Sequence, residues 1–128
     1  MPDFTMDGEK IRYTLPRETR IRRNGDYRRI YARGKRFNNR AGLMYLVKAP
    51  GRPTRIGFVT TKKIGHAFAR NRARRLMKEV YRLHRHELAG GHEAVFLAGS
   101  FLTRASYQEA EKAILALWRK AGMMEAKA

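Results

Sequence analysis

The sequence predicts an α+β fold, with a single small sheet of about four strands and three helices in one domain. Three observations lead to this prediction. A chain of 128 residues is long enough to bury one core. Its 43% hydrophobic content is typical of a folded protein. Along the chain, the apolar spacing follows the order helix, strands, helix, strand, helix, which is typical of α+β folds.

The first helix is expected between Asn24 and Gly34, because asparagine is a good N-cap and glycine often follows the last helical residue. Tyr27, Ile30 and Tyr31 are spaced i, i+3 and i+4, so they form one apolar and aromatic stripe on this helix. Such a stripe usually packs into a core, but tyrosines also suit a surface platform. The pattern alone leaves both readings open.

Three strands are expected after this helix. Residues 35–40 form a short one, and residues 42–49 and 55–61 form two more with alternating apolar side chains. The turn sequence Pro50-Gly51-Arg52-Pro53 separates the last two strands. An antiparallel hairpin is therefore predicted between them.

A basic helix is expected from about His66, with no proline or glycine for some five turns. At about 100° per residue, one side is apolar and packs. The opposite arc holds Asn71, Arg74, Arg75, Lys78, Arg82 and Arg85. Arg70 and Arg72 point to opposite edges of this arc, because residues i and i+2 do not share a helix face. Solvated faces usually mix both signs of charge, so a face with Glu79 as its one acid favours ligand contact.

A glycine pair follows the basic helix, and residues 93–98 have the short apolar character of a buried strand. The last helix is expected to begin at Ser106, because Glu109 three residues later completes a capping box. This helix should continue to Gly122.

The domain boundaries are expected where this pattern ends. Residues 1–18 mix proline, glycine and acids without an apolar period, so they are expected to be a mobile N-terminal extension. Residues 19–122 form the predicted domain. Residues 123–128 are expected to be a frayed tail.

The charge of the chain indicates a polyanionic partner. The net charge is +18, and the segment from Tyr27 through Lys78 contains 16 Lys and Arg and no Asp or Glu. An anionic membrane surface is the other partner that such a charge attracts. Apolar runs such as Leu43 to Val47 are far too short to span a bilayer. With no cysteine and no signal-peptide pattern, a cytoplasmic protein is expected.

Catalysis by the protein alone is disfavoured. Acids are absent from the basic segment, and His84 and His86 are two residues apart, which separates them on a helix. No serine or threonine has a local partner for nucleophilic catalysis, and no glycine lies in a phosphate-binding loop motif. We therefore predict no catalytic residue and no metal ligand in this chain.

Cations interleaved with aromatic residues are typical of a site for single-stranded nucleic acid, since phosphates pair with cations and unpaired bases stack on rings. Tyr27, Tyr31, Phe37 and Tyr45 all lie in the acid-free segment. Lys62 and Lys63, at the turn before the basic helix, are further phosphate candidates.

The turn and the basic helix resemble a known family. The run Lys62-Lys63-Ile64-Gly65, with Ala67, Arg70-Asn71-Arg72 and Arg74-Arg75 in register, is similar to the signature of the protein subunit of bacterial ribonuclease P. The resemblance extends over about Arg20 to Ala121. It includes a basic opening run, two aromatics four residues apart and Ser106-Tyr107 before the last helix. His66 stands where this family often has asparagine.

The resemblance implies a function. In this family a large RNA subunit with its bound Mg²⁺ cleaves precursor tRNA to form the mature 5′ end, and the protein assists. It implies that the RNA subunit is contacted by Arg70, Asn71, Arg72, Arg74, Arg75 and Lys78. It implies that the single-stranded 5′ leader lies against Tyr27, Tyr31, Tyr45, Thr61, Lys62 and Lys63. It also implies a left-handed β-α-β crossover, against the general right-handed preference, and no cofactor or stable protein partner for the protein itself.

Two other functions remain as alternatives. A ribosomal or general RNA chaperone protein could use the same basic patch without a catalytic partner, and the RNA bound in cells would separate the two. A helix-turn-helix DNA-binding protein is less favoured, because the basic helix follows a strand and not a short helix. Sequence-specific binding of duplex DNA would support that function.

Overall fold

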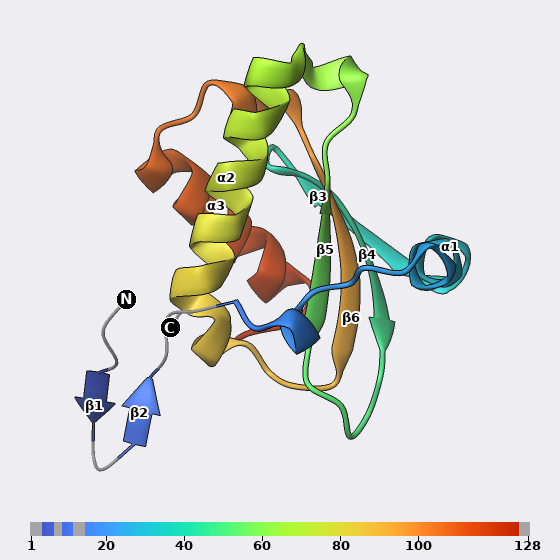
Figure 1. The fold of residues 1–128 in the computed structure, drawn as a ribbon, viewed down its shortest axis with the longest axis vertical. Helices are drawn as coiled ribbons and strands as arrows, with labels where there is room; N and C mark the ends of the chain where they lie inside the picture. The colour runs from blue at the N-terminus through green and yellow to red at the C-terminus, as the bar shows by residue number, and fades with distance from the viewer. Residues whose placement is uncertain (1–3, 7–8, 12–14, 126–128) are drawn as a thin grey trace.

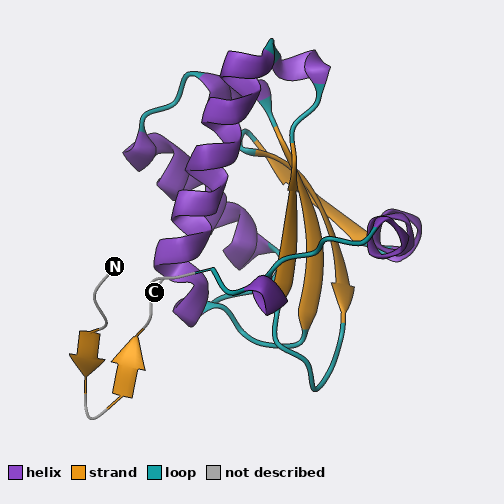
Figure 2. Cartoon of the chain, in the orientation of Figure 1, coloured by secondary structure: helices purple, strands orange, loops and turns teal. Residues whose placement is uncertain are grey.

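The structure is a computed structural model that describes residues 4–6, 9–11 and 15–125. The described part contains the helices α1 (Asn24–Arg33), α2 (Ala67–His84) and α3 (Tyr107–Lys120). One mixed sheet contains β3 (Lys35–Asn39), β4 (Gly42–Lys48), β5 (Arg55–Val59) and β6 (His92–Ala98). Short 3-10 helices are η1 (Arg17–Thr19), η2 (Lys62–Ile64), η3 (Arg85–Glu87) and η4 (Ser100–Thr103). The predicted α+β class is confirmed (Figure 2).

The strand order in the sheet is β3-β4-β6-β5. β4 pairs antiparallel with β3 and β6, whereas β5 pairs parallel with β6. The predicted hairpin between residues 42–49 and 55–61 is therefore wrong, because β6 lies between these strands. Most residues of β6 are buried, and the inner position lets this apolar strand bury both of its faces. The left-handed sense of the β5-α2-β6 connection stays a prediction from the family resemblance.

The sheet carries helices on both faces (Figure 1). α2 and α3 lie together on one face, and α1 lies alone on the other. Alternate residues of each strand therefore belong to two different cores. On β4, Met44 and Leu46 face α2 and α3, whereas Tyr45 and Val47 face α1.

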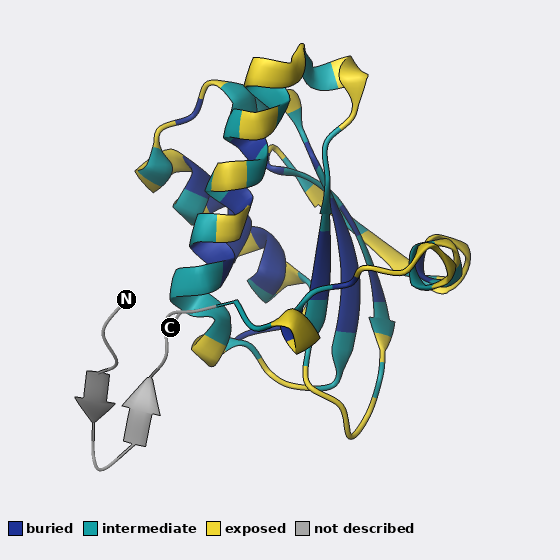
Figure 3. Ribbon diagram, viewed as in Figure 1, coloured by how far each residue is buried: buried dark blue, intermediate teal, exposed yellow. Residues whose placement is uncertain are grey.

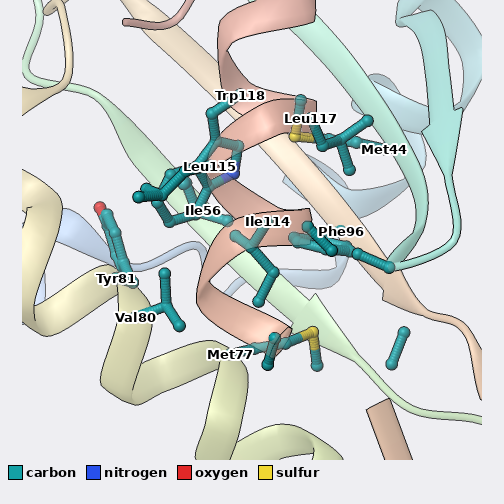
Figure 4. Packing of buried hydrophobic residues seen from close by; sticks show 14 of the residues in the cluster. Met44, Ile56, Met77, Val80, Tyr81, Phe96, Ile114, Leu115, Leu117 and Trp118 are labelled. Carbon is teal, nitrogen blue, oxygen red and sulfur yellow. The ribbon is translucent and has the colours of Figure 1, made fainter. Parts of the chain in front are cut away.

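The larger core lies between the sheet and the helix pair. Met77 and Val80 of α2 and Ile114 and Trp118 of α3 are fully buried there against Phe96 of β6 (Figure 4). The capping box at the start of α3 is present as predicted, since the Ser106 side chain accepts from the Glu109 backbone N–H. This core fixes the rotation of α2, so that its polar side faces away from the sheet.

Tyr81 is a core residue of α2 that the sequence analysis did not single out. Its ring is fully buried, and its hydroxyl donates to the Thr19 carbonyl oxygen over 2.7 Å. Burial raises the pKa of Tyr81 to about 12. The hydrogen bond ties the segment before α1 to the end of α2 nearest η3.

The two ends of the chain differ from the sequence expectation in detail. β1 (Phe4–Met6) pairs antiparallel with β2 (Glu9–Ile11) inside the predicted extension, whose residues 1–3, 7–8 and 12–14 lie outside the described residues. Met123 is fully buried, and its carbonyl oxygen accepts from the Ala89 N–H over 2.8 Å. The ordered chain thus continues past Gly122. Residues 126–128 lie outside the described residues.

The described residues contain no helix that is both long enough and apolar enough to cross a membrane. α2 is long enough to be considered, but its outer side is strongly charged. Figure 3 shows the exposed positions along the outer side of α2 and over most of α1. The residues of both predicted interaction surfaces lie on or beside these two helices.

Candidate nucleic-acid interface

The outer side of α2 is cationic and unpaired at its centre. Asn71, Arg75 and Lys78 are exposed there, about one turn apart along the helix. Within the part of the chain that the structure describes, neither Arg75 nor Lys78 forms an ion pair with a carboxylate. Glu79, the acid of this helix, pairs with Arg82 instead. Arg75 and Lys78 therefore have charges that are available to an anionic partner.

Arg72 is turned away from this outer side. Its two terminal nitrogens donate to the carbonyl oxygens of Leu102 and Ala105, over 3.1 and 2.6 Å. These hydrogen bonds tie α2 to η4 and to the chain just before α3. The guanidinium is thus already used inside the protein, and a contact with the RNA subunit would compete with both hydrogen bonds.

Arg70 lies on the opposite edge of α2 from Arg72, as the helical spacing predicts. It lines a hollow beside η2 together with Lys62, Lys63 and Gly65. The Arg70 Nε atom is buried and has no hydrogen-bond partner among the described residues. The hollow therefore brings Arg70 of the predicted RNA-subunit site together with Lys62 and Lys63 of the predicted leader site.

The turn that forms this hollow depends on Gly65. Its φ of 144° is a conformation that residues with a side chain rarely adopt, and a Cβ atom there would lie 2.9 Å from the Ala69 Cβ. His66 follows as the N-cap of α2, but its side chain makes no capping hydrogen bond. The first backbone N–H groups of α2 therefore receive no cap from the His66 side chain.

Arg74 contacts the end of β5. Its guanidinium donates to the Thr60 hydroxyl over 2.7 Å and to the Asn71 side-chain oxygen over 3.2 Å. Thr61 is exposed, and its carbonyl oxygen accepts from the Ile64 N–H over 3.2 Å at the start of η2. Thr61 is therefore at the surface beside Lys62, the next residue of the predicted leader site.

The three tyrosines lie on the other face of the sheet, between α1 and β4 or β5. The rings of Tyr31 and Tyr45 meet edge to face, with centroids 5.1 Å apart. Tyr31 is 38% exposed and Tyr45 is half-buried, so both rings line the surface at this point. Burial raises the pKa of Tyr31, so its phenol stays neutral at physiological pH.

Tyr27 is more deeply placed than Tyr31. Its ring packs on Gly57 of β5, where a Cβ atom would come within 2.5 Å of the Tyr27 hydroxyl oxygen. The hydroxyl donates to the Ile21 carbonyl oxygen over 3.2 Å. Burial raises the pKa of Tyr27 as well. Tyr27 is thus both a core residue and a surface residue, since one part of its side chain packs in the core and the rest reaches the surface.

A groove over the edge of β5 joins the two predicted residue sets. It is lined by residues before α1, by α1, by β5 and by α2, among them Arg20, Arg22, Tyr27, Gly57, Arg74 and Lys78. Tyr27 of the predicted leader site and Lys78 of the predicted RNA-subunit site therefore share one surface depression. Arg20 and Arg22 belong to the basic run before α1, for which the sequence predicted no role.

α1 is held on the sheet by a buried acid that the sequence analysis missed. Glu93 of β6 is 2% exposed, and its carboxylate accepts from Arg29 of α1 over 2.8 Å and from Arg55 of β5 over 3.0 Å. Asp26 of α1 lies 3.2 Å from Arg29 and 3.5 Å from Arg55. An acid at the start of an apolar strand was the available signal, because a buried carboxylate requires cationic partners.

No group of three or more His, Cys, Asp or Glu side chains is arranged to hold a metal ion in residues 4–6, 9–11 and 15–125. His84 is the histidine with the most acidic surroundings, with Glu87 at 2.6 Å and Glu111 at 2.7 Å. These contacts join the end of α2 to η3 and α3. They lie in the half of α2 away from Arg70 and the η2 turn.

Comparison with known proteins identifies the family. A sequence model of the Ribonuclease P family matches residues 15–122. The chain belongs to the ribonuclease P protein component family. The ribonuclease P protein component of Clostridium botulinum (strain Langeland) is 37% identical over 108 residues, which cover 84% of this chain and 97% of that relative. That of Alkaliphilus metalliredigens is 37% identical over 101 residues, covering 79% and 91%.

Solved structures of the family share the fold. The RNase P protein of Staphylococcus aureus superposes with a TM-score of 0.74 at 22% identity, covering 84% of this chain and 98% of that one. The RNase P protein of Thermotoga maritima gives a TM-score of 0.71 at 24% identity, with coverage of 79% and 96%. The shared fold agrees with the family that the sequence comparisons show, which is part of a ribonucleoprotein of tRNA processing.

Proposed function

We propose that the chain binds the catalytic RNA subunit of ribonuclease P and the 5′ leader of precursor tRNA, and so assists removal of the leader. The RNA subunit contacts the outer side of α2 and Arg70. The leader lies along the α1 face, against Tyr27, Tyr31 and Tyr45, and also contacts Thr61, Lys62 and Lys63 at the turn before α2. Bond cleavage and the Mg²⁺ it requires belong to the RNA subunit, which makes the protein an accessory subunit of the endoribonuclease.

The observation that carries the proposal is the pair of unpaired, exposed cations on α2. Arg75 and Lys78 project from a helix whose rotation is fixed by a buried apolar side, so both side chains start from the outer surface before binding. Each cation that neutralises a phosphate releases condensed counterions, which favours binding at low salt. Fixed cations also lower the repulsion between the phosphates of two RNA molecules that must approach each other.

The tyrosine face supports the leader site. Tyr31 presents an exposed ring that is held edge-on by Tyr45, and single-stranded RNA offers unstacked bases to such a ring. On the same face, Tyr27 lines the groove over the β5 edge, and this groove extends to Arg74 and Lys78 of α2. A leader lying in the groove would thus run from the tyrosines toward the RNA-subunit surface. The two sites, on opposite faces of the sheet, would then meet at its β5 edge.

A reconstitution assay tests the proposal. Purified protein is added to a bacterial ribonuclease P RNA, and cleavage of a precursor tRNA is followed as Mg²⁺ is lowered. The protein should reduce the Mg²⁺ concentration needed for half-maximal cleavage, because its cations replace part of the ionic screening. Unchanged cleavage at low Mg²⁺ would refute the proposal.

A double variant and a matched control sharpen this assay. Arg75→Ala with Lys78→Ala removes two exposed charges from α2 and should restore much of the Mg²⁺ requirement. Lys112→Ala with Lys120→Ala removes two exposed charges from α3, on a different helix, and should have a smaller effect. Equal effects of the two double variants would mean that total charge matters and that α2 is not the interface.

The remaining partners and the location follow from the same proposal. The chain works in the cytoplasm, with the ribonuclease P RNA and precursor tRNA as its partners and no stable protein partner. RNA recovered with the protein from cells, after crosslinking, should therefore contain the RNA subunit and precursor tRNA. Recovery of ribosomal or diverse messenger RNA in their place would favour the chaperone alternative.

A further inference from the structure

Phe68 is an aromatic side chain that the fold leaves in water. It lies in the first turn of α2 and is 80% exposed. Tyr31, at 38%, is the other exposed large hydrophobic residue in the described part of the chain. Single exposed apolar residues are common on protein surfaces, so exposure alone assigns no role to Phe68. Its charged surroundings are more informative.

Phe68 stands on the cationic side of α2. Residues three and four positions apart are neighbours on a helix, which places Asn71 and Arg72 beside it and the exposed Arg75 one turn further on. Lys78, also exposed, follows on the same outer side of the helix. The ring therefore stands at the start of an exposed row that continues through Asn71, Arg75 and Lys78.

This surrounding chemistry selects the class of partner. An apolar protein surface placed over Phe68 would have to desolvate the neighbouring cations without compensation. A second copy of this chain would bring like charges together, since the net charge is +18. An unpaired nucleotide satisfies both features, because its base stacks on the ring while the adjoining phosphates meet the cations.

We propose that Phe68 is a stacking site for an unpaired base of the ribonuclease P RNA subunit, with Arg75 and Lys78 binding neighbouring phosphates. This inference rests on the proposed function of α2 as the RNA-subunit interface. It adds an aromatic contact to a surface that otherwise consists of charges. The site is separate from the tyrosine face, which lies across the sheet beside α1.

Affinity measurements with three variants test the site. Phe68→Ala and Phe68→Leu should each weaken binding of the RNA subunit by about 5- to 150-fold, the range found when a stacked base is lost. Phe68→Tyr keeps a ring and should bind within about threefold of the unsubstituted protein. The leucine variant is decisive, since it keeps an apolar side chain and removes only the aromatic plane. Binding by Phe68→Leu at full strength would overturn the proposal.

The salt dependence of the same binding distinguishes stacking from charge. Phe68→Leu changes no charge, so RNA binding should release the same number of counterions. The slope of log affinity against log salt should therefore stay unchanged. Arg75→Ala should reduce that slope by about 0.7 to 0.9. A changed slope in Phe68→Leu would mean that the substitution disturbs the neighbouring cations, which would overturn the stacking assignment.

A fluorescent variant reports the contact directly. In Phe68→Trp the new indole is in water, whereas Trp118 is fully buried. Addition of the RNA subunit should quench the exposed indole, because a stacked base quenches its emission. The unsubstituted protein, with Trp118 alone, is the control. Quenching of equal size in both proteins would contradict the site.

Two further readouts separate the possible failures. If the unsubstituted protein does not bind the RNA subunit, the proposed function itself fails. If it binds and only the leader-dependent part of precursor tRNA affinity changes in Phe68→Leu, the base belongs to the leader and the inference fails alone. Conversion of a dimer into a monomer by Phe68→Leu, with unchanged RNA affinity, would likewise assign Phe68 to a protein contact.

Discussion

α1 and α2 both cover the sheet and both carry arginines beside aromatic rings, but they are anchored by different forces. α2 buries Ala73, Met77, Val80 and Tyr81 against the larger core. α1 buries Ile30 alone and is otherwise held through Arg29, which binds the buried Glu93. One helix is held by apolar area and the other by an ion pair whose carboxylate is buried.

This difference shows that the cations of the chain have separate roles. Arg29 and Arg55 neutralise Glu93, and Arg72 binds carbonyl oxygens of the η4 segment. Arg75 and Lys78 on the outer side of α2 have no such partner among the described residues. The net charge therefore overstates the number of cations available to RNA. The predictions below separate the two groups, starting with the largest expected effect.

Loss of the buried carboxylate should affect α1 most. Glu93→Gln removes the buried carboxylate and leaves Arg29 and Arg55 with Asp26 as their acidic neighbour, so it should lower the free energy of unfolding by about 3 kcal/mol. Urea unfolding followed by circular dichroism measures this loss. Glu87→Gln, which removes an exposed carboxylate paired with His84, is the control and should cost less than about 1 kcal/mol.

Glu93→Gln should also affect the two proposed RNA-binding surfaces differently, because one lies beside α1 and the other on α2. Under conditions where Glu93→Gln is still folded, the leader-dependent part of precursor tRNA affinity should fall, because Arg29 no longer fixes Tyr31 on α1. Affinity for the RNA subunit should change less, since α2 is anchored independently. An equal loss in both affinities would show that the two helices do not act separately.

Removal of the exposed ring on α1 should have the next largest effect. Tyr31→Ala should weaken binding of precursor tRNA by the holoenzyme by about 1–3 kcal/mol, the value for one stacked base. Binding of mature tRNA, which has no leader, should be nearly unchanged. Tyr31→Phe should retain most of the affinity of the unsubstituted protein, because the hydroxyl is not needed for stacking. Equal weakening for both tRNAs would remove the platform role of Tyr31.

Arg72 should behave as a structural residue although it belongs to the Arg-Asn-Arg motif. Arg72→Ala removes two hydrogen bonds to carbonyl oxygens and should lower the free energy of unfolding by about 1–2 kcal/mol. The salt dependence of RNA-subunit binding should remain close to that of the unsubstituted protein. A slope lower by about one, with no loss of stability, would return Arg72 to the set of phosphate contacts.

The stability of the α1 anchor should depend on acid pH. Burial alone would raise the pKa of Glu93, but hydrogen bonds from Arg55 and Arg29 outweigh it and hold the pKa below the ordinary value. A group whose pKa is lower in the folded state stabilises that state above its unfolded pKa of about 4.3 and loses this effect as the pH falls through its folded pKa. Unfolding curves between about pH 6 and pH 3 should therefore show a smaller loss of stability in Glu93→Gln than in the unsubstituted protein.

The smallest effect on stability is expected on the outer side of α2. Arg75→Ala should change the free energy of unfolding by less than about 0.5 kcal/mol, because the side chain is exposed and unpaired. The same variant should weaken RNA-subunit binding at low salt and reduce the salt slope. Destabilisation comparable to that of Arg72→Ala would contradict the division between structural and ligand-binding cations.

Local sequence spacing predicted the parts of this protein that depend on neighbouring residues. The amphipathic side of α2, the capping box at Ser106 and the tyrosine stripe of α1 follow from helical periodicity and capping chemistry. The opposite directions of Arg70 and Arg72 also follow, because each residue turns a helix by about 100°. The residues of the ribonuclease P signature led to the family, which the comparisons establish.

Tertiary structure decided the features that join distant parts of the chain. Glu93 meets Arg29 across 64 positions and Arg55 across 38, and no local spacing connects them. The turn at Pro50 favoured a hairpin, yet β6 separates β4 from β5, because the central position lets this apolar strand bury both faces. Local backbone geometry sets which side of a helix is charged. Only the packing of the whole chain decides which of those charges are neutralised and which remain for a partner.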